Sequence, residues 1–187
     1  NMHSLSNLFP VNLTAQWQNQ PSEQISALLM DWLFDPTSLT ARLKQHCQTF
    51  YVEVLGQEVI ACPANEACEI VRTGEKVLAR EVLLYCDNKP HVFARSLLPL
   101  TSLTGEQTLL AELGNKPLGQ VIFNNPSLER KLIQIAAFSR QSSVGQLAEN
   151  LSLTVSNTLW GRRSLFYLED KPLVVAEVFL PAALAYQ

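Results

Sequence analysis

A single glutamate interrupts an otherwise apolar run near the end of the chain. Glu177 lies in the segment 173–180, which is short, rich in β-branched and aromatic residues, and bounded by Pro172 and Pro181. These properties are typical of a buried strand. A carboxylate taken out of water costs several kcal/mol unless it is paired or protonated. A cost of that size indicates a functional role, and general-base chemistry is one role that a buried glutamate suits.

A buried arginine is the natural partner for such a carboxylate. Residues 77–85 form a second strand-like run, in which a period of two puts Arg80 on one face with Leu78, Val82 and Leu84. A guanidinium stays charged on an apolar face and therefore needs a carboxylate. That carboxylate belongs either to Glu177, in a structural pair within the core, or to a ligand held between the two residues.

Two segments of the chain resemble each other. Residues 89–99 align without a gap on residues 171–181, with Lys, Pro, Val, Ala, Leu and Pro recurring in place. In this alignment Arg95 falls on Glu177, and the preceding strands match Arg80 with Arg162. An internal duplication would put these four residues in equivalent settings of one sheet. The alternative is that two hairpins of similar length share turn residues by chance.

The elements that must position these residues are mainly strands. Alternating or apolar runs predict strands at residues 49–55, 77–86, 91–98, 164–168 and 172–180, and polar turn residues join the last four into two hairpins. The strands do not alternate with helices as parallel βαβ units require. The sequence therefore predicts an α+β fold with a mainly antiparallel sheet of about six strands, covered by helices.

Helices are predicted between these strands from capping residues and apolar stripes. Ser22 is a candidate N-cap for a helix over 22–34, and a second helix is expected over 37–47. Residues 105–113 indicate a short helix. Asn125-Pro126 reads as the start of another helix, whose apolar stripe is Leu128, Leu132, Ile135 and Ala136. The polar segment 139–157 is interpreted as a long excursion or flap with a short helix around Leu147, within a single domain of residues 1–187.

Composition excludes several classes of protein. The 187 residues are 47% hydrophobic and 17% charged, and the formal net charge is −3. No basic block indicates nucleic-acid binding, and no apolar stretch approaches the roughly 18 residues of a membrane span. The N-terminal region does not resemble a secretory signal peptide, so a cytoplasmic protein is expected. Glycine-rich dinucleotide and phosphate motifs are absent from the sequence.

The cysteines and histidines do not form a metal-binding pattern. The four cysteines occur as no CxxC pair, and the three histidines lie at no zinc-finger spacing from them. We therefore expect neither a metal nor a cofactor, and we expect Cys47, Cys62, Cys68 and Cys86 to be free thiols, as is usual in a reducing cytoplasm.

Four motifs, in this order along the chain, resemble the chorismate pyruvate-lyase family, the 4-hydroxybenzoate synthases of bacterial ubiquinone biosynthesis. They are Arg80-Glu81-Val82-Leu83-Leu84, Gly114-Asn115-Lys116-Pro117-Leu118-Gly119, Leu159-Trp160-Gly161-Arg162-Arg163-Ser164 and Glu177-Val178-Phe179-Leu180-Pro181. The resemblance implies a carbon–oxygen lyase that converts chorismate to 4-hydroxybenzoate and pyruvate without a cofactor. It also implies a closed internal cavity under mobile flaps.

The same resemblance implies a set of site residues. Arg80 would bind the ring carboxylate of chorismate, and Glu177 would approach the hydroxyl group at the other end of the ring. Leu118 would supply a backbone contact, and Leu39 would line the pocket where relatives often have methionine. Glu177 is then either the general base for the ring proton or the group that orients the hydroxyl.

Some assignments stay open in the sequence. The second carboxylate of chorismate could be held by Arg162, Arg163 or Arg95, and each of these could instead be a structural residue. The fold is also expected in ligand-binding domains of bacterial transcription regulators, so a non-catalytic domain that binds an aromatic acid is the alternative function. A related lyase with a different aromatic product is a third reading. A monomer is expected, because an internal site needs no second subunit.

Overall fold

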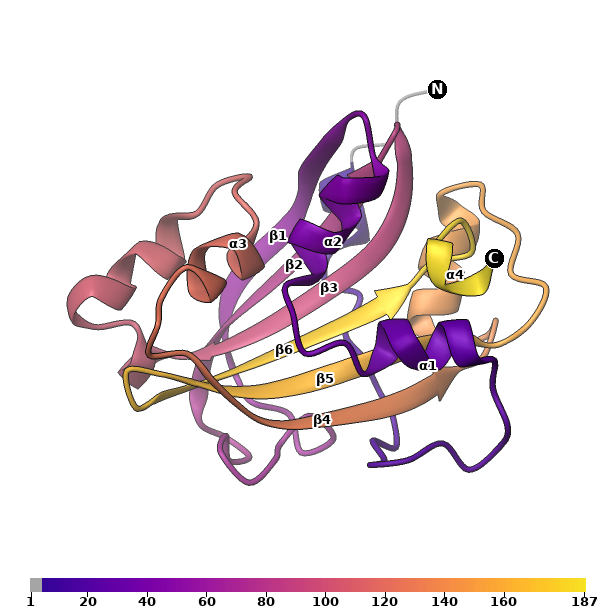
Figure 1. Ribbon diagram of the computed structural model, residues 1–187. Coiled ribbons are helices and arrows are strands. Elements are labelled where there is room, and N and C mark those ends of the chain that lie inside the picture. The colour runs from indigo at the N-terminus through magenta and orange to yellow at the C-terminus, as the bar shows by residue number, and fades with distance from the viewer. Residues whose placement is uncertain (1–4) are drawn as a thin grey trace.

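The computed structural model describes residues 5–187 as a six-stranded antiparallel sheet with short helices packed against it (Figure 1). The strand order is β1-β2-β3-β6-β5-β4. The strands are β1 (Phe50–Ala61), β2 (Lys76–Cys86), β3 (Lys89–Pro99), β4 (Glu129–Phe138), β5 (Leu159–Leu168) and β6 (Lys171–Phe179). The predicted α+β class and the two predicted hairpins, β2–β3 and β5–β6, are therefore confirmed.

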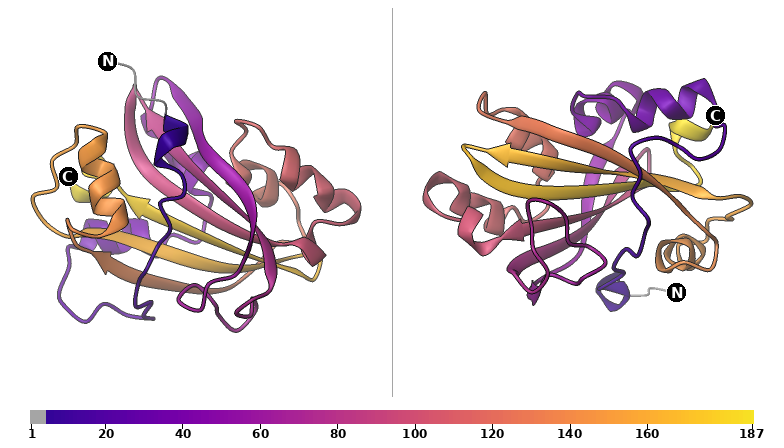
Figure 2. Two further views of the ribbon diagram at one scale, coloured as in Figure 1. Left: turned by 180° about the vertical axis from the view of Figure 1, so that it is seen from behind. Right: turned by 90° about the horizontal axis from the view of Figure 1, so that it is seen from below.

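Helices lie on both faces of this sheet. The α-helices are α1 (Ala27–Leu33), α2 (Leu39–His46), α3 (Leu118–Phe123) and α4 (Ser143–Asn150); 3₁₀ helices are η1 (Leu5–Leu8), η2 (Leu100–Ser102), η3 (Gly105–Glu112) and η4 (Leu184–Tyr186). In Figure 1, α1, α2 and α3 lie in front of the sheet, and the view from behind in Figure 2 shows α4 on the other side. We call these the front and back faces.

Serine caps determine where the first two α-helices begin. The Ser26 hydroxyl accepts a hydrogen bond from the backbone N–H of Leu29, and Ser38 caps α2 in the same way through Ala41. The prediction that Ser22 caps the first helix was therefore wrong by four residues. The apolar side of α1 and α2 packs on the front face of the sheet, where Trp32, Leu33 and Leu43 are fully buried.

The back face is covered by the N-terminal segment and by α4. Val11 and Leu13 pack with Val144, Leu147 and Ala148 of α4 against the back of the sheet. The predicted short helix around Leu147 is therefore present. Its three apolar side chains are at most 3% exposed, so α4 contributes to the core of the back face.

The prediction of a helix after Asn125-Pro126 was wrong, because residues 129–138 form the edge strand β4. Asn125 does not cap a helix: its Oδ1 accepts a hydrogen bond from the N–H of Ser127, and its Nδ2 donates to Glu169 in the β5–β6 turn. The spacing of Leu128, Leu132 and Ile135 fits a helix, but pairing with β5 supplies the backbone hydrogen bonds instead.

Strand register decides which arginines share a face. Glu177 lies opposite Arg162 on β5 and opposite Ala94 on β3, whereas Arg95 lies opposite Ala176. Residues directly opposite each other in an antiparallel pair point to the same side. Glu177 and Arg162 therefore share the front face with Arg80, while Arg95 points to the back. The expectation that a duplication would place all four residues in equivalent settings was wrong.

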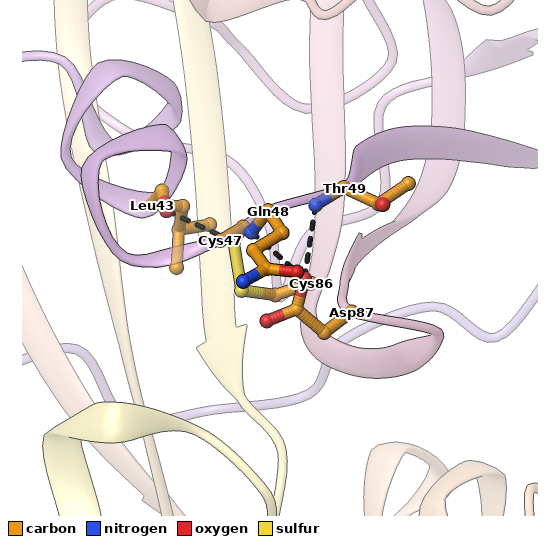
Figure 3. The surroundings of a disulfide bond; sticks show 6 residues. All are labelled: Leu43, Cys47, Gln48, Thr49, Cys86 and Asp87. Atoms are coloured by element: carbon orange, nitrogen blue, oxygen red, sulfur yellow. Dashed lines mark hydrogen bonds between the residues drawn. A yellow bond between two sulfur atoms is a disulfide. The ribbon is translucent and has the colours of Figure 1, made fainter.

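The cysteines also depart from the prediction, because Cys47 and Cys86 form a disulfide bond across a sequence separation of 39 residues (Figure 3). Cys47 follows α2 directly, and Cys86 ends β2. Beside them, Asp87 accepts hydrogen bonds from the backbone N–H groups of Gln48 and Thr49. The bond and these contacts fix the end of α2 to the β2–β3 turn. Cys62 and Cys68 are free.

Reduction of this disulfide should lower the stability of the fold. Closing a loop of this length in the unfolded chain is worth about 3–4 kcal/mol, which corresponds to a fall in melting temperature of roughly 10 °C for a domain of this size. The measurement is a thermal melt with and without reductant, with a Cys47→Ser/Cys86→Ser variant as the control that should not respond. Thiol labelling of the denatured, unreduced protein should count two thiols, and a count of four would contradict the disulfide.

Candidate active site

A cavity lies on the front face of the sheet, between the strands and helices α2 and α3. Strands β2 to β6 all contribute to its lining. Its apolar walls include Val82, Leu84, Phe166 and Val175. Its charged lining residues are Arg80, Arg130, Arg162 and Glu177. A mostly apolar pocket with a few convergent charged groups is the usual form of a small-molecule site.

Arg80 is buried in this cavity without an acidic partner. Its side chain is held by two backbone carbonyls, Gly114 at 2.9 Å from Nη1 and Lys116 at 3.0 Å from Nη2. Within the described residues, no carboxylate lies within 4 Å of its guanidinium. Only 3% of the residue is exposed, and burial lowers the pKa of Arg80. A buried guanidinium that is balanced only by carbonyl dipoles is suited to bind an anion.

Glu177 is paired with Arg162, so the direct pairing of Arg80 with Glu177 considered from the sequence was wrong. Arg162 Nε donates to Glu177 Oε1 at 2.9 Å, across the β5–β6 ladder. The same guanidinium donates through Nη1 to the carbonyls of Trp32, Leu33 and Asp35, at 3.2, 3.3 and 2.9 Å. Within the described residues, Glu177 Oε2 makes no hydrogen bond. The carboxylate is thus fixed by one oxygen while the other remains available to a ligand.

The two leucines proposed from the sequence also reach the cavity. Leu39 and Leu118 are the first residues of α2 and α3, and both are buried in its lining. Helices α2 and α3 lie next to each other, and Lys44 Nζ donates to Gln120 Oε1 at 2.7 Å between them. Pro117 is the residue before α3, and its side chain makes no capping hydrogen bond to the first turn of that helix. The structure therefore brings Leu39, Arg80, Leu118 and Glu177 to one cavity.

Arg95 and Arg163 lie on the other side of the sheet and do not line this cavity. Arg95 forms ion pairs with Glu66 and Glu81, at 2.7 and 2.9 Å. Arg163 Nη2 donates to Gln134 Oε1 at 2.6 Å, and its guanidinium lies 5.2 Å from the centre of the Trp17 ring. These contacts anchor the N-terminal segment and the loop around Glu66 to the back face.

Arg130 lines the cavity but was missed in the sequence analysis. It lies on β4, opposite Phe166 of β5, with its guanidinium carbon 4.9 Å from the centre of the Phe166 ring. Burial, together with the nearby charge of Arg162, lowers the pKa of Arg130 to about 10, so it stays protonated at neutral pH. The residue was overlooked because its segment was assigned to a helix. A strand assignment for 129–138 would have made Arg130 a candidate, as an arginine on one face of the sheet.

Within residues 5–187, no group of three or more histidine, cysteine, aspartate and glutamate side chains is arranged to hold a metal ion. No helix in this part of the chain has the length and apolar character needed to cross a membrane.

The fold and the cavity define an α+β domain suited to a small organic anion, and solved structures share this fold. PhnF from Mycobacterium smegmatis is 14% identical, with a TM-score of 0.59, and the match covers 79% of this chain and 65% of that one. The ligand-binding domain of a putative GntR-family transcriptional regulator from Bordetella bronchiseptica is 21% identical, with a TM-score of 0.51, covering 72% and 86%. At these identities the likeness shows the fold alone.

Sequence comparison gives the family. The chorismate lyase family model matches residues 11–187. A probable chorismate pyruvate-lyase from Pseudoalteromonas translucida is 45% identical over 179 residues, covering 95% of this chain and 98% of the relative. Another, from Psychromonas ingrahamii, is 46% identical over 158 residues, covering 84% and 85%. The chain belongs to the chorismate lyase family.

Proposed function

We propose that this chain is a chorismate pyruvate-lyase, which eliminates pyruvate from chorismate to give 4-hydroxybenzoate, the aromatic precursor of ubiquinone. The observation that carries the proposal is which charged side chains of the cavity have an oppositely charged partner. Among residues 5–187, Arg80 has no acidic partner, while Glu177 is held by Arg162 on the other side of the same cavity. A ring with a carboxylate at one end and a hydroxyl group at the other fits between such groups.

Each site residue has a role in this proposal. Arg80 binds the ring carboxylate, since a guanidinium offers two donors to one carboxylate group. The backbone of Leu118 adds a contact, and Leu39 packs against the ring. Glu177 either accepts a hydrogen bond from the hydroxyl group or takes the proton from the carbon that bears it. The cavity closes over the ring, which excludes water and strengthens these charged contacts.

The reaction needs orientation and charge placement more than a strong catalyst. The ring loses the proton from the carbon that bears the hydroxyl group, and the bond between the neighbouring carbon and the ether oxygen breaks. The ring becomes aromatic, and the released enolpyruvate takes up a proton to become pyruvate. Because aromatisation makes the elimination favourable, positioning of the substrate and stabilisation of the departing enolate are what the protein must supply.

Purified protein incubated with chorismate should form equimolar 4-hydroxybenzoate and pyruvate, at a rate that a chelator does not change. Chromatography against authentic 4-hydroxybenzoate identifies the ring product, and a lactate dehydrogenase assay measures pyruvate. A different aromatic product would indicate a related lyase. Binding of chorismate without turnover would contradict the enzyme and favour the alternative, a non-catalytic domain that binds aromatic acids.

We also propose that the chain acts as a monomer in the cytoplasm. The proposed site is built from one chain, with every charged lining residue on strands of a single sheet. Gel filtration with light scattering measures the mass in solution. A dimer whose dissociation leaves the rate of 4-hydroxybenzoate formation unchanged would contradict the monomer but not the site.

A further inference from the structure

The cavity carries an excess of positive charge that one carboxylate of a ligand does not balance. Its charged lining residues are three arginines and one glutamate, an excess of two positive charges. Chorismate has two carboxylates, so a bound molecule would neutralise this excess, whereas 4-hydroxybenzoate has one and would leave a positive charge unmatched. The ring carboxylate occupies Arg80 in the proposed function, so the second carboxylate needs another cationic partner.

Contacts within the cavity identify the arginine that is free to be this partner. Arg162 is already engaged by Glu177 and by three backbone carbonyls. Arg95 and Arg163 lie on the back face and line a different pocket. Within residues 5–187, Arg130 makes a single long hydrogen bond, from Nη1 to the Asp35 carbonyl at 3.4 Å. Its Nε is buried and has no hydrogen-bond partner in this part of the chain.

An unpartnered buried N–H is costly, and a charged one more so. The guanidinium of Arg130 is nevertheless held in place, because it lies over the ring of Phe166 at 4.9 Å and near that of Phe123 at 5.5 Å. Such aromatic contacts orient a guanidinium and leave its N–H groups for hydrogen bonding. Arg130 is therefore a fixed cation whose donors, apart from the one long hydrogen bond of Nη1, are not used within the described protein.

The chemistry of chorismate puts its second carboxylate at this end of the cavity. The ring carboxylate and the hydroxyl group are on opposite ring carbons, and the enolpyruvyl ether is on the carbon next to the hydroxyl. A ring that places its hydroxyl at Glu177 therefore directs the enolpyruvyl group to the surroundings of Glu177, away from Arg80. Arg130 is in those surroundings, since its Nη1 and the Nη1 of Arg162, the partner of Glu177, donate to the same Asp35 carbonyl.

We infer that Arg130 binds the carboxylate of the enolpyruvyl group and so distinguishes the substrate from the aromatic product. This inference rests on the proposed function. Arg80 contacts a carboxylate that substrate and product share, whereas Arg130 contacts one that leaves with pyruvate. After the elimination, 4-hydroxybenzoate is held without Arg130, and the guanidinium is ready for the next chorismate molecule.

The test is an Arg130→Gln variant assayed with both ligands. Loss of one charged contact should lower kcat/KM for chorismate by about 10- to 100-fold, mostly through KM. The Kd of 4-hydroxybenzoate, measured by calorimetry, should change less than about twofold, because the product lacks the second carboxylate. Arg140→Gln is the matched control: its side chain is 62% exposed and pairs with Glu149 on the surface, and it should leave both constants unchanged.

Three results would overturn the inference. Equal loss of affinity for chorismate and 4-hydroxybenzoate would make Arg130 a general support of the site, and unchanged kcat/KM would remove it from substrate binding. If Arg130→Gln does not fold, Arg130→Lys is the second variant, because it keeps the charge. Arg130→Lys should still lower kcat/KM for chorismate and leave the binding of 4-hydroxybenzoate intact. Equal losses for the two ligands in Arg130→Lys would also overturn the inference. Wild-type protein that fails to turn over chorismate would instead refute the proposed function.

Discussion

Replacing Arg80 by alanine should weaken the binding of both chorismate and 4-hydroxybenzoate by roughly 100-fold or more. Truncating one partner of a buried, hydrogen-bonded charge pair costs about 2–5 kcal/mol, and each 1.4 kcal/mol is about a factor of ten in affinity. Arg80 has no acidic partner among the described residues, so the ligand carboxylate is the anion that it should serve. Both ligands have that ring carboxylate, so both should lose affinity.

Calorimetry with 4-hydroxybenzoate and steady-state kinetics with chorismate measure this effect. Arg80→Lys is an informative second variant, since it keeps the charge but loses the two-donor geometry, and it should fall between wild type and alanine. Arg72→Ala, at an exposed position, is the control for loss of one positive charge. Unchanged affinity of Arg80→Ala for both ligands would remove Arg80 from the site.

Arg80→Ala and Arg130→Gln together form a selectivity test. The first variant should affect substrate and product alike, while the second should affect the substrate alone. A general loss of positive potential in the cavity would make the two variants behave in the same way. Different responses to 4-hydroxybenzoate would therefore separate two carboxylate positions from a diffuse electrostatic effect.

The parts of the fold that the sequence predicts are those set by local pattern. Alternation in residues 77–86 correctly put Arg80 on one face with Leu78, Val82 and Leu84, because side chains of a strand alternate whatever its neighbours. The hairpin turns were found from their residues: Asp87 and Asn88, like Glu169 and Asp170, adopt positive φ angles in the β2–β3 and β5–β6 turns. These features require no knowledge of distant segments.

Apart from the cap of α1, which is Ser26 and not Ser22, the missed features depend on partners that are remote in sequence. The ion pair of Glu177 follows from the β5–β6 register, and the separation of Arg95 from Glu177 follows from the β3–β6 register. Neither register is specified by composition. Residues 129–138 match a helical spacing and become a strand through pairing with β5, which hid Arg130. Cys47 and Cys86 are far apart in the chain and meet only where α2 reaches the β2–β3 turn.

Replacing Glu177 by glutamine should lower the maximal rate of 4-hydroxybenzoate formation, and the size of the fall separates its two possible roles. A general base usually contributes about 10²–10⁴ to the rate. Glutamine keeps the shape and can still accept a hydrogen bond from a hydroxyl group, but it cannot take a proton. A fall of 100-fold or more would therefore support proton removal by Glu177, whereas a fall below about threefold would exclude it.

The variant also removes the acidic partner of Arg162, so its structural effect must be measured separately. Arg162 would keep its three carbonyl contacts, which should preserve the position of the side chain. The melting temperature and the Kd of 4-hydroxybenzoate report whether the cavity is intact, and Glu149→Gln on the surface is the control for loss of one carboxylate. Chorismate deuterated at the carbon that bears the hydroxyl group shows which step the substitution slows. An isotope effect on kcat that rises in Glu177→Gln places the loss in the step that breaks the carbon–hydrogen bond, and the size of the fall in rate then separates proton removal from orientation.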